Sequence, residues 1–247
     1  MKVIIHGYTG KMGGHVQDAC KAAGVEIAAM AAFDGVDDPA THTYSSLAEV
    51  TEEADVLIDF SNHVTTKDVL DYCVSRSLPG VICTTGQTDE EKKMIADASE
   101  KTAVFFSANM SLGIAVLSDI AKRAAAMFPD ADIEIVEKHH NRKLDVPSGT
   151  ALFLADSIKS VRPEAEYNIG RHEYGKRTKK EIGIHSLRMG NEVGTHEIYI
   201  NTGTEVLTLT HKAESRAVFA DGALKAAEFL AGKPAGLYTM KELMGEN

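Results

Sequence analysis

The sequence of 247 residues is poor in cysteine and in positive charge, and it has no long apolar run. Three cysteines (Cys20, Cys73, Cys83) show neither close pairing nor metal-ligand spacing, which argues against a disulfide framework and fits a reducing, cytoplasmic compartment. No run approaches the ~18 apolar residues of a membrane-spanning helix, and the first apolar run is too short for a signal sequence. The net charge of −10 argues against nucleic-acid binding.

What is present is typical of a globular protein. Hydrophobic residues make up 44% and charged residues 25% of the chain, which excludes disordered, collagen-like and coiled-coil classes. The positive charge is concentrated in two segments, residues 138–143 and 171–188. Basic segments in an acidic protein suggest a small anionic ligand, although such runs also occur as solvated faces.

The order of expected elements changes near residue 111. Before it, apolar strands alternate with helices; strands are expected at 3–5, 25–33, 54–60, 81–86 and 103–106, and helices at 16–23, 47–53, 65–76 and 89–99. This alternation predicts a parallel, doubly covered α/β sheet of the Rossmann-like type. After it come helices 114–127, 151–158 and 215–230, with strands 132–137, 181–188, 196–201 and 205–211. Strands without helices between them predict a central α+β domain with an open mixed sheet.

A glycine loop lies between the first expected strand and helix. Gly7, Gly10 and Gly13 are spaced G-x-x-G-x-x-G, so backbone N–H groups can approach a pyrophosphate at the start of a helix. Alone, the motif also fits a tight strand–helix turn. In this context it predicts a dinucleotide site.

The choice between NADH and NADPH stays open. An acid after the second strand normally binds the ribose 2′-hydroxyl, and Asp34 lies at a suitable distance along the chain. Counted from the strand, the side chain at that turn is instead Ala32 or Phe33. Lys11 in the glycine loop is a cation that can meet a 2′-phosphate.

Polar turns follow the fourth and fifth expected strands. Thr84-Thr85-Gly86 and Ser107-Ala108-Asn109-Met110 lie where open α/β sheets bind ligands, which favours contacts with the nicotinamide. Each segment considered alone is also an ordinary turn.

Residues 137–151 (EKHHNRKLDVPSGTA) carry the densest chemistry. Two adjacent histidines, an arginine and a lysine within five positions suit neutralisation of a dianion and proton donation. The following Pro-Ser-Gly-Thr begins a helix whose free N–H groups suit a carboxylate. Zinc is disfavoured, because adjacent histidines lack i, i+4 spacing. Arg171, Lys176 and Arg177 either complete the anion site or contact a neighbouring subunit.

These motifs resemble the 4-hydroxy-tetrahydrodipicolinate reductase (dihydrodipicolinate reductase) family over the whole chain. The resemblance rests on GYTGKMG at 7–13, DFS at 59–61, TTG at 84–86, SANMSLG at 107–113, the segment 137–151 and EIGIHSLRMGNEVGTHE at 181–197. The patterns HHxxKxDxPSGTA and GIHSxR are specific, whereas the glycine loop alone is not.

The resemblance implies a homotetramer that uses NADH or NADPH. Residues 1–111 and 215–247 would form the dinucleotide-binding domain, and 112–214 the substrate-binding and tetramerisation domain. His139 would donate the proton, and Lys143 would be a second acid–base or binding group. His140, Gly149 and Thr150 would hold the substrate carboxylates. The implied cofactor-binding residues are Gly7, Tyr8, Thr9, Gly10, Lys11, Met12, Asp34, Cys83, Thr84, Thr85, Ser107, Ala108, Asn109 and Met110.

Two positions depart from the family pattern, Cys83 where glycine is common and Met110 where phenylalanine is common. The implied reaction is the reduction, with loss of water, of a cyclic hydroxy-imine dicarboxylate in lysine and diaminopimelate synthesis. Alternatives are a related two-domain dehydrogenase acting on another anion, and a nucleotide-binding sensor without activity.

Overall fold

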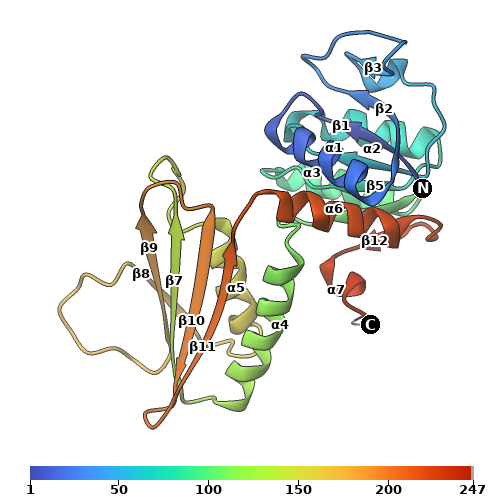
Figure 1. The fold of residues 1–247 in the computed structure, drawn as a ribbon. Coiled ribbons are helices and arrows are strands. Elements are labelled where there is room, and N and C mark those ends of the chain that lie inside the picture. Colours follow the sequence, from blue (N-terminus) through green and yellow to red (C-terminus); the bar gives the residue numbers. More distant parts are fainter. Residues whose placement is uncertain (246–247) are drawn as a thin grey trace. The chain divides into compact units, whose positions relative to one another are not determined.

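The structure is a computed structural model that describes residues 1–245 of the chain. The chain divides into two compact units (Figure 1). The first unit comprises Met1–Ser111 and the chain from Arg216 onward, and the second comprises Leu112–Ser215. Each unit has its own sheet.

The first unit contains a seven-stranded sheet in the order β12-β6-β5-β4-β1-β2-β3, with every pairing parallel. Its strands are β1 (Lys2–His6), β2 (Glu26–Ala31), β3 (Thr43–Tyr44), β4 (Val56–Asp59), β5 (Gly80–Ile82), β6 (Ala103–Phe106) and β12 (Gly236–Tyr238). Its helices are α1 (Lys11–Ala23), α2 (Thr66–Ser75), α3 (Asp89–Ser99), α6 (Ala217–Leu230) and α7 (Met240–Leu243), with short 3₁₀ turns η1 (Leu47–Glu49) and η2 (His63–Thr65). The predicted Rossmann-like parallel sheet is confirmed.

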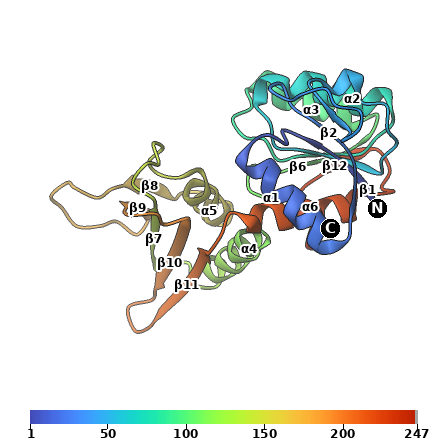
Figure 2. The same ribbon diagram turned by 45° about the horizontal axis from the view of Figure 1, so that its top comes forward.

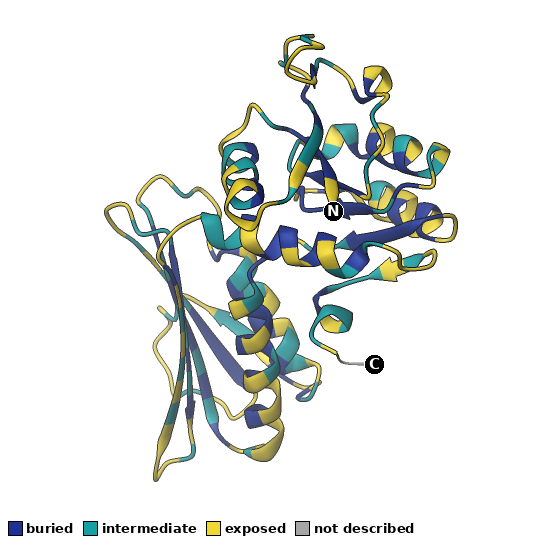
Figure 3. Ribbon diagram, turned by 45° about the vertical axis from the view of Figure 1, so that its right-hand side comes forward, coloured by how far each residue is buried: buried dark blue, intermediate teal, exposed yellow. Residues whose placement is uncertain are grey.

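Helices cover both faces of this sheet: α2 and α3 pack on one side, and α1 and α6 on the other (Figure 2). The central strands are therefore apolar throughout, as in Val3-Ile4-Ile5 of β1 and Val56-Leu57-Ile58 of β4, which are fully buried. The helices alternate buried and exposed residues along their length (Figure 3). The sequence did not predict the short edge strands β3 and β12 or the helix α7.

The second unit contains a five-stranded sheet in the order β11-β10-β7-β9-β8. Its strands are β7 (Asp132–His139), β8 (Glu166–Ile169), β9 (Glu181–Arg188), β10 (Gly194–Asn201) and β11 (Val206–Ala213). Strand β10 is antiparallel to β7 and β11, whereas β9 is parallel to β7 and β8. The predicted mixed sheet is confirmed, although β8 was not predicted.

One face of this sheet packs against α4 (Leu112–Met127) and α5 (Gly149–Lys159). The buried residues of β7 alternate with partly exposed ones, so every second side chain lies against the helices. Buried isoleucines from three strands form this core: Ile133, Ile135, Ile182, Ile184, Ile198 and Ile200. At one end of the sheet, the same alternation brings polar residues onto the covered face.

Candidate active site

The polar end of this face is centred on His139, the last residue of β7. Glu137 lies two residues earlier on the same strand face, and its Oε2 is 2.6 Å from His139 Nδ1. Glu137 is fully buried and His139 is 8% exposed. An imidazole is thus held by a carboxyl group in an environment that excludes most water.

Glu137 accepts three further hydrogen bonds, from two residues. Arg188, at the end of β9, donates from Nη1 to Oε2 and from Nη2 to Oε1, each at 2.8 Å. The backbone N–H of Ser148 donates to Oε1 at 3.1 Å. Burial opposes ionisation of Glu137, but the hydrogen bonds from His139 and Arg188 outweigh it and hold the pKa of Glu137 well below its usual range. An ionised carboxylate only accepts, so Nδ1 of His139 carries a hydrogen.

Nε2 is consequently the ring nitrogen of His139 left for exchange of a proton. The space beside it is provided by Gly194, since a Cβ on this glycine would lie 3.0 Å from Nε2. His196 packs edge-on against the His139 ring, with centroids 5.2 Å apart. Burial, and then the neighbouring His139, lowers the pKa of His196 to about 3. His196 is therefore uncharged near neutral pH.

The segment after β7 leads to the start of α5. Ser148 caps this helix, with its Oγ accepting from the N–H of Ala151 at 3.2 Å, and Gly149 and Thr150 form the first helical turn. Lys143 Nζ lies 2.9 Å from Asp145 Oδ1. The Asp145 carboxylate also accepts from the backbone of Gly149, and although burial opposes ionisation, the bond from Lys143 lowers the pKa of Asp145. The groups around α5 are thus arranged to bind a carboxylate.

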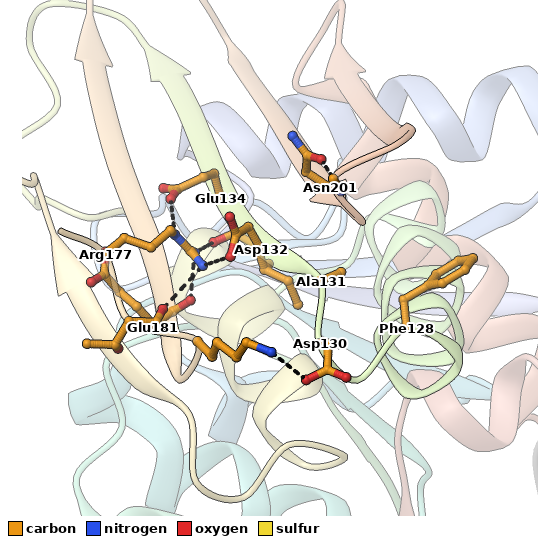
Figure 4. Close-up of polar contacts among 12 residues, drawn as sticks. Phe128, Asp130, Ala131, Asp132, Glu134, Arg177, Glu181 and Asn201 are labelled. Carbon is orange, nitrogen blue, oxygen red and sulfur yellow. Dashed lines mark hydrogen bonds and ion pairs between the residues drawn. The ribbon is translucent and has the colours of Figure 1, made fainter.

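The second basic segment is divided between the two ends of the sheet. Arg177 Nη1 is 2.5 Å from Asp132 Oδ1, and its Nε is 3.3 Å from Glu134 (Figure 4). Arg171 forms an ion pair with Glu181. Asp132 begins β7, about 20 Å from His139 along the strand. Arg177 and Arg171 therefore bind the start of the sheet, and the suggestion that they complete the anion site is wrong.

In the first unit, the glycine loop joins β1 to α1. Gly7 has φ of +86°, and a Cβ there would lie 2.5 Å from the carbonyl oxygen of Phe60. A Cβ on Gly13 would lie 2.3 Å from the carbonyl oxygen of Gly7. Helix α1 begins after Gly10 with neither a side-chain cap nor an acid in its first turn. The loop thus needs its glycines and leaves a helix N-terminus that suits an anion.

Asp34 lies beside this loop. Thr9 Oγ1 donates to Asp34 Oδ1 at 2.5 Å, and Asp34 is exposed. Of the other two candidates, Ala32 is buried, and Phe33 is 94% exposed. Asp34 is therefore the acid after β2 that the structure brings to the glycine loop. Lys11 and Met12 open α1, and Tyr8 packs against Gly35.

The two predicted polar turns follow β5 and β6. Thr84 is buried and Thr85 exposed, while burial and the nearby Asp59 raise the pKa of the Cys83 thiol well above its ordinary value. Ser107 Oγ donates to the carbonyl oxygen of Asn109 at 2.7 Å, which closes the second turn. Ala108 is exposed. Met110 is 2% exposed, and a Cβ on Gly222 would collide with its carbonyl oxygen.

The sequence interpretation gave no role to Glu137, Arg188, Ser148 or His196. The sequence did contain a signal for Glu137. Every second residue of this strand, Ile133, Ile135, Glu137 and His139, lies on the same face. In β9, the same spacing of two residues places Arg188 on the strand face of Ile182 and Ile184. Pairing between strands distant in sequence was needed to bring these residues together.

Two further properties bear on the class of protein. Within residues 1–245, no group of three or more His, Cys, Asp or Glu side chains is arranged to hold a metal ion. None of the helices in the part of the chain that the structure describes is long and apolar enough to cross a membrane.

A Rossmann-type unit with a glycine loop, combined with a second unit that presents a histidine–glutamate pair, is the architecture of a two-domain nicotinamide-dependent oxidoreductase. Family models confirm the class and narrow it. Residues 1–110 match "Dihydrodipicolinate reductase, N-terminus", and residues 113–244 match "Dihydrodipicolinate reductase, C-terminus". The chain belongs to the 4-hydroxy-tetrahydrodipicolinate reductase family, whose members are NAD(P)H-dependent oxidoreductases.

Relatives match over nearly their full length. The 4-hydroxy-tetrahydrodipicolinate reductase of Caldanaerobacter subterraneus subsp. tengcongensis is 48% identical over 99% of this chain and 98% of its own. That of Clostridium tetani is 43% identical, covering 97% and 95%. A solved dihydrodipicolinate reductase from Paenisporosarcina sp. TG-14, with dipicolinate bound, has a TM-score of 0.78 and 26% identity, covering 98% of both chains. These similarities indicate that the protein is a reductase of lysine and diaminopimelate biosynthesis.

Proposed function

We propose that the two units divide the reduction of 4-hydroxy-tetrahydrodipicolinate between them. The first unit binds NADH or NADPH, and its free helix N-terminus at α1 supports a role in binding the pyrophosphate. When bound, the reduced nicotinamide supplies the hydride. The proposed cofactor-binding residues are the loop Gly7 to Met12, Asp34, Cys83 to Thr85, and Ser107 to Met110.

The second unit binds the dicarboxylate substrate. Its proposed ligands are His140, Gly149 and Thr150, with Lys143 as the neighbouring cation. The contacts of Asp145 support this role, because an internal carboxylate already binds Lys143 and the start of α5. A substrate carboxylate would replace Asp145 on these groups. The dipicolinate bound by the solved relative is itself a planar dicarboxylate, which fits a site of this charge.

His139 is the proposed proton donor, and its pairing with Glu137 is the observation that carries the proposal. With Nδ1–H bound to Glu137, a proton at Nε2 exists only when the ring is an imidazolium. The Glu137 carboxylate fixes the ring plane, while Gly194 leaves space at Nε2. The reduction adds one hydride and one proton to the substrate and releases water. The proton on Nε2 is the one that accompanies the hydride.

The test is His139→Gln, assayed by NAD(P)H oxidation with enzymatically generated substrate. We expect kcat to fall by about 10²- to 10⁴-fold, because positioned proton transfer contributes about that much, while dinucleotide affinity stays unchanged. A matched control is His185→Gln, since His185 also pairs with a glutamate on this sheet, at 2.9 Å from Glu134, but on the other face. Equal turnover of the His139 variant and wild type would remove His139 from the role.

Two outcomes address the reaction itself. No oxidation of either nucleotide by the wild type would refute the reductase activity. Competition by pyridine-2,6-dicarboxylate distinguishes this substrate from other anions, because only a site for two carboxylates at that spacing binds the planar analogue tightly.

The homotetramer and the cytoplasmic location also remain proposals. Family membership supports the tetramer, which light scattering coupled to size-exclusion chromatography tests directly. The three cysteines are buried free thiols, which suits a reducing compartment.

A further inference from the structure

A buried cluster of polar side chains lies at the end of β4 in the first unit. Its centre is Asp59, which is 1% exposed. Oδ1 of Asp59 lies 2.8 Å from His6 Nδ1 and accepts from Ser61 Oγ at 2.5 Å. Oδ2 accepts from Thr84 Oγ1 at 2.6 Å. One carboxyl group therefore connects residues that follow or end three neighbouring strands, β1, β4 and β5.

The cluster lies at the position where the strand order of the sheet reverses. Strands β2 and β3 continue on one side of β1, whereas β4, β5 and β6 continue on the other. Ligands of open α/β sheets bind beyond the carboxyl ends of the strands at this switch point. His6 and Asp59 are the last residues of β1 and β4, so their contact lies at the carboxyl ends of the two strands that meet at the switch point.

The glycine loop after β1 and the turn after β5 both begin at this cluster. His6 immediately precedes Gly7, whose Cα lies so close to the carbonyl oxygen of Phe60 that no Cβ fits. The backbone N–H of Phe60 also donates to the carbonyl oxygen of His6 at 3.0 Å. On the other side, Thr84 accepts from the N–H of Ser61 at 3.0 Å while it donates to Asp59. The separation of the two loops is thus set by hydrogen bonds through Asp59.

Core packing does not explain a cluster of this kind. Burying a carboxyl group and an imidazole costs desolvation free energy, which apolar side chains of similar volume avoid. The rest of β1 and β4 is packed in that apolar way, by residues such as Ile5 and Ile58. The buried polar side chains of β1 and β4, His6 and Asp59, lie only at the carboxyl ends of these strands.

We propose that Asp59 and His6 are positioning residues for the dinucleotide, acting through Gly7 and Thr84 rather than by contact with the cofactor. This inference rests on the proposed dinucleotide site of the first unit. Loss of the Asp59 charge weakens the bonds from His6, Ser61 and Thr84 together. The glycine loop and the Thr84 turn then lose their fixed separation, and the dinucleotide binds more weakly.

The experiment compares Asp59→Asn with two controls. Asp55→Asn removes the carboxylate that accepts from the Lys2 N–H at 2.6 Å, at the opposite end of the same strand pair. Ile5→Val removes one methyl group from the buried residue before His6 and destabilises the unit without touching the cluster. Kd for NADH and NADPH is measured by fluorescence of the reduced nicotinamide, with KM, kcat and melting temperature measured in parallel.

We expect Asp59→Asn to raise Kd and KM for the dinucleotide by about tenfold, the effect of weakening hydrogen bonds to a charged group, with kcat at saturating dinucleotide changed less than about twofold. Both controls should keep the wild-type Kd. Ser61→Ala, which removes one donor to Asp59, gives a smaller rise and remains informative if Asp59→Asn does not fold.

Three results would overturn the inference: an unchanged Kd in soluble Asp59→Asn, an unchanged Kd in Ser61→Ala when Asp59→Asn is insoluble, or an equal rise in Ile5→Val. Failure of the wild type to bind either dinucleotide is a separate outcome, which would refute the dinucleotide site itself.

Discussion

The uncharged state of His196 predicts a specific dependence of stability on pH. His196 is 4% exposed and lies opposite Glu137 in the pairing of β10 with β7. Burial is the largest cause that lowers its pKa to about 3, and repulsion by His139 adds to it. In the unfolded chain the same imidazole titrates near its ordinary value of about 6.5.

Because the folded pKa lies below the unfolded one, the unfolded state takes up this proton first as the pH falls. The stabilisation is complete above about pH 6.5 and is lost progressively as the pH approaches 3. Each unit of difference between the folded and unfolded pKa values corresponds to about 1.4 kcal/mol. The difference for His196 therefore contributes about 5 kcal/mol to the free energy of unfolding.

The perturbation is His196→Gln, which removes the titrating group. Denaturant unfolding of wild type and variant is compared between about pH 7 and pH 4, so that the contributions of the other titrating groups cancel. We expect the stability advantage of the wild type to fall by about 3 kcal/mol over the range from about pH 6.5 to pH 4. In NMR, the His196 ring signal, assigned by its loss in the variant, should not titrate above about pH 5. Parallel pH profiles, or a His196 signal that titrates near pH 6.5, would refute the reasoning.

Two further substitutions test the proposed sites separately. Gly194→Ala places a methyl group 3.0 Å from His139 Nε2, so we expect kcat to fall by about tenfold without a change in dinucleotide Kd; an unchanged kcat would show that Nε2 does not need this space. Asp34→Asn removes the negative charge beside the glycine loop, which repels a 2′-phosphate, so the ratio of KM values for NADH and NADPH should shift by about tenfold in favour of NADPH. A ratio equal to that of the wild type would exclude Asp34 as the ribose contact.

The fold was predictable wherever burial is complete. Strands such as Val3-Ile4-Ile5 lie under helices on both faces and are continuously apolar, so composition alone indicates them. The strands that were missed lie at sheet edges. Strand β3 has two residues, and β8 (Glu166–Ile169) has no buried residue, so neither leaves an apolar pattern in the sequence. Pairing with a neighbouring strand creates them.

The candidate site was predictable only in part, for a related reason. His139, Lys143 and the start of α5 lie within one segment of the chain, so their chemistry is visible in the sequence. Arg188 lies far along the chain, and its role depends on the parallel register that places it opposite His139. The basic segment 171–188 contains arginines with two different roles. Arg188 binds Glu137 beside His139, whereas Arg177 binds Asp132 at the other end of the sheet. Charge in the sequence did not distinguish these ends.

Each unit has a buried histidine–carboxyl pair at the end of two parallel strands, but the partners differ. Glu137 is bound by Arg188 through two hydrogen bonds as well as by His139. The guanidinium compensates the Glu137 charge whether or not the imidazole is protonated, so His139 can release its proton without leaving a buried charge unpaired. Asp59 is bound instead by one imidazole and the hydroxyl groups of Ser61 and Thr84. Such a cluster suits fixed geometry, whereas the arginine-backed pair suits a group that changes its charge during each turnover.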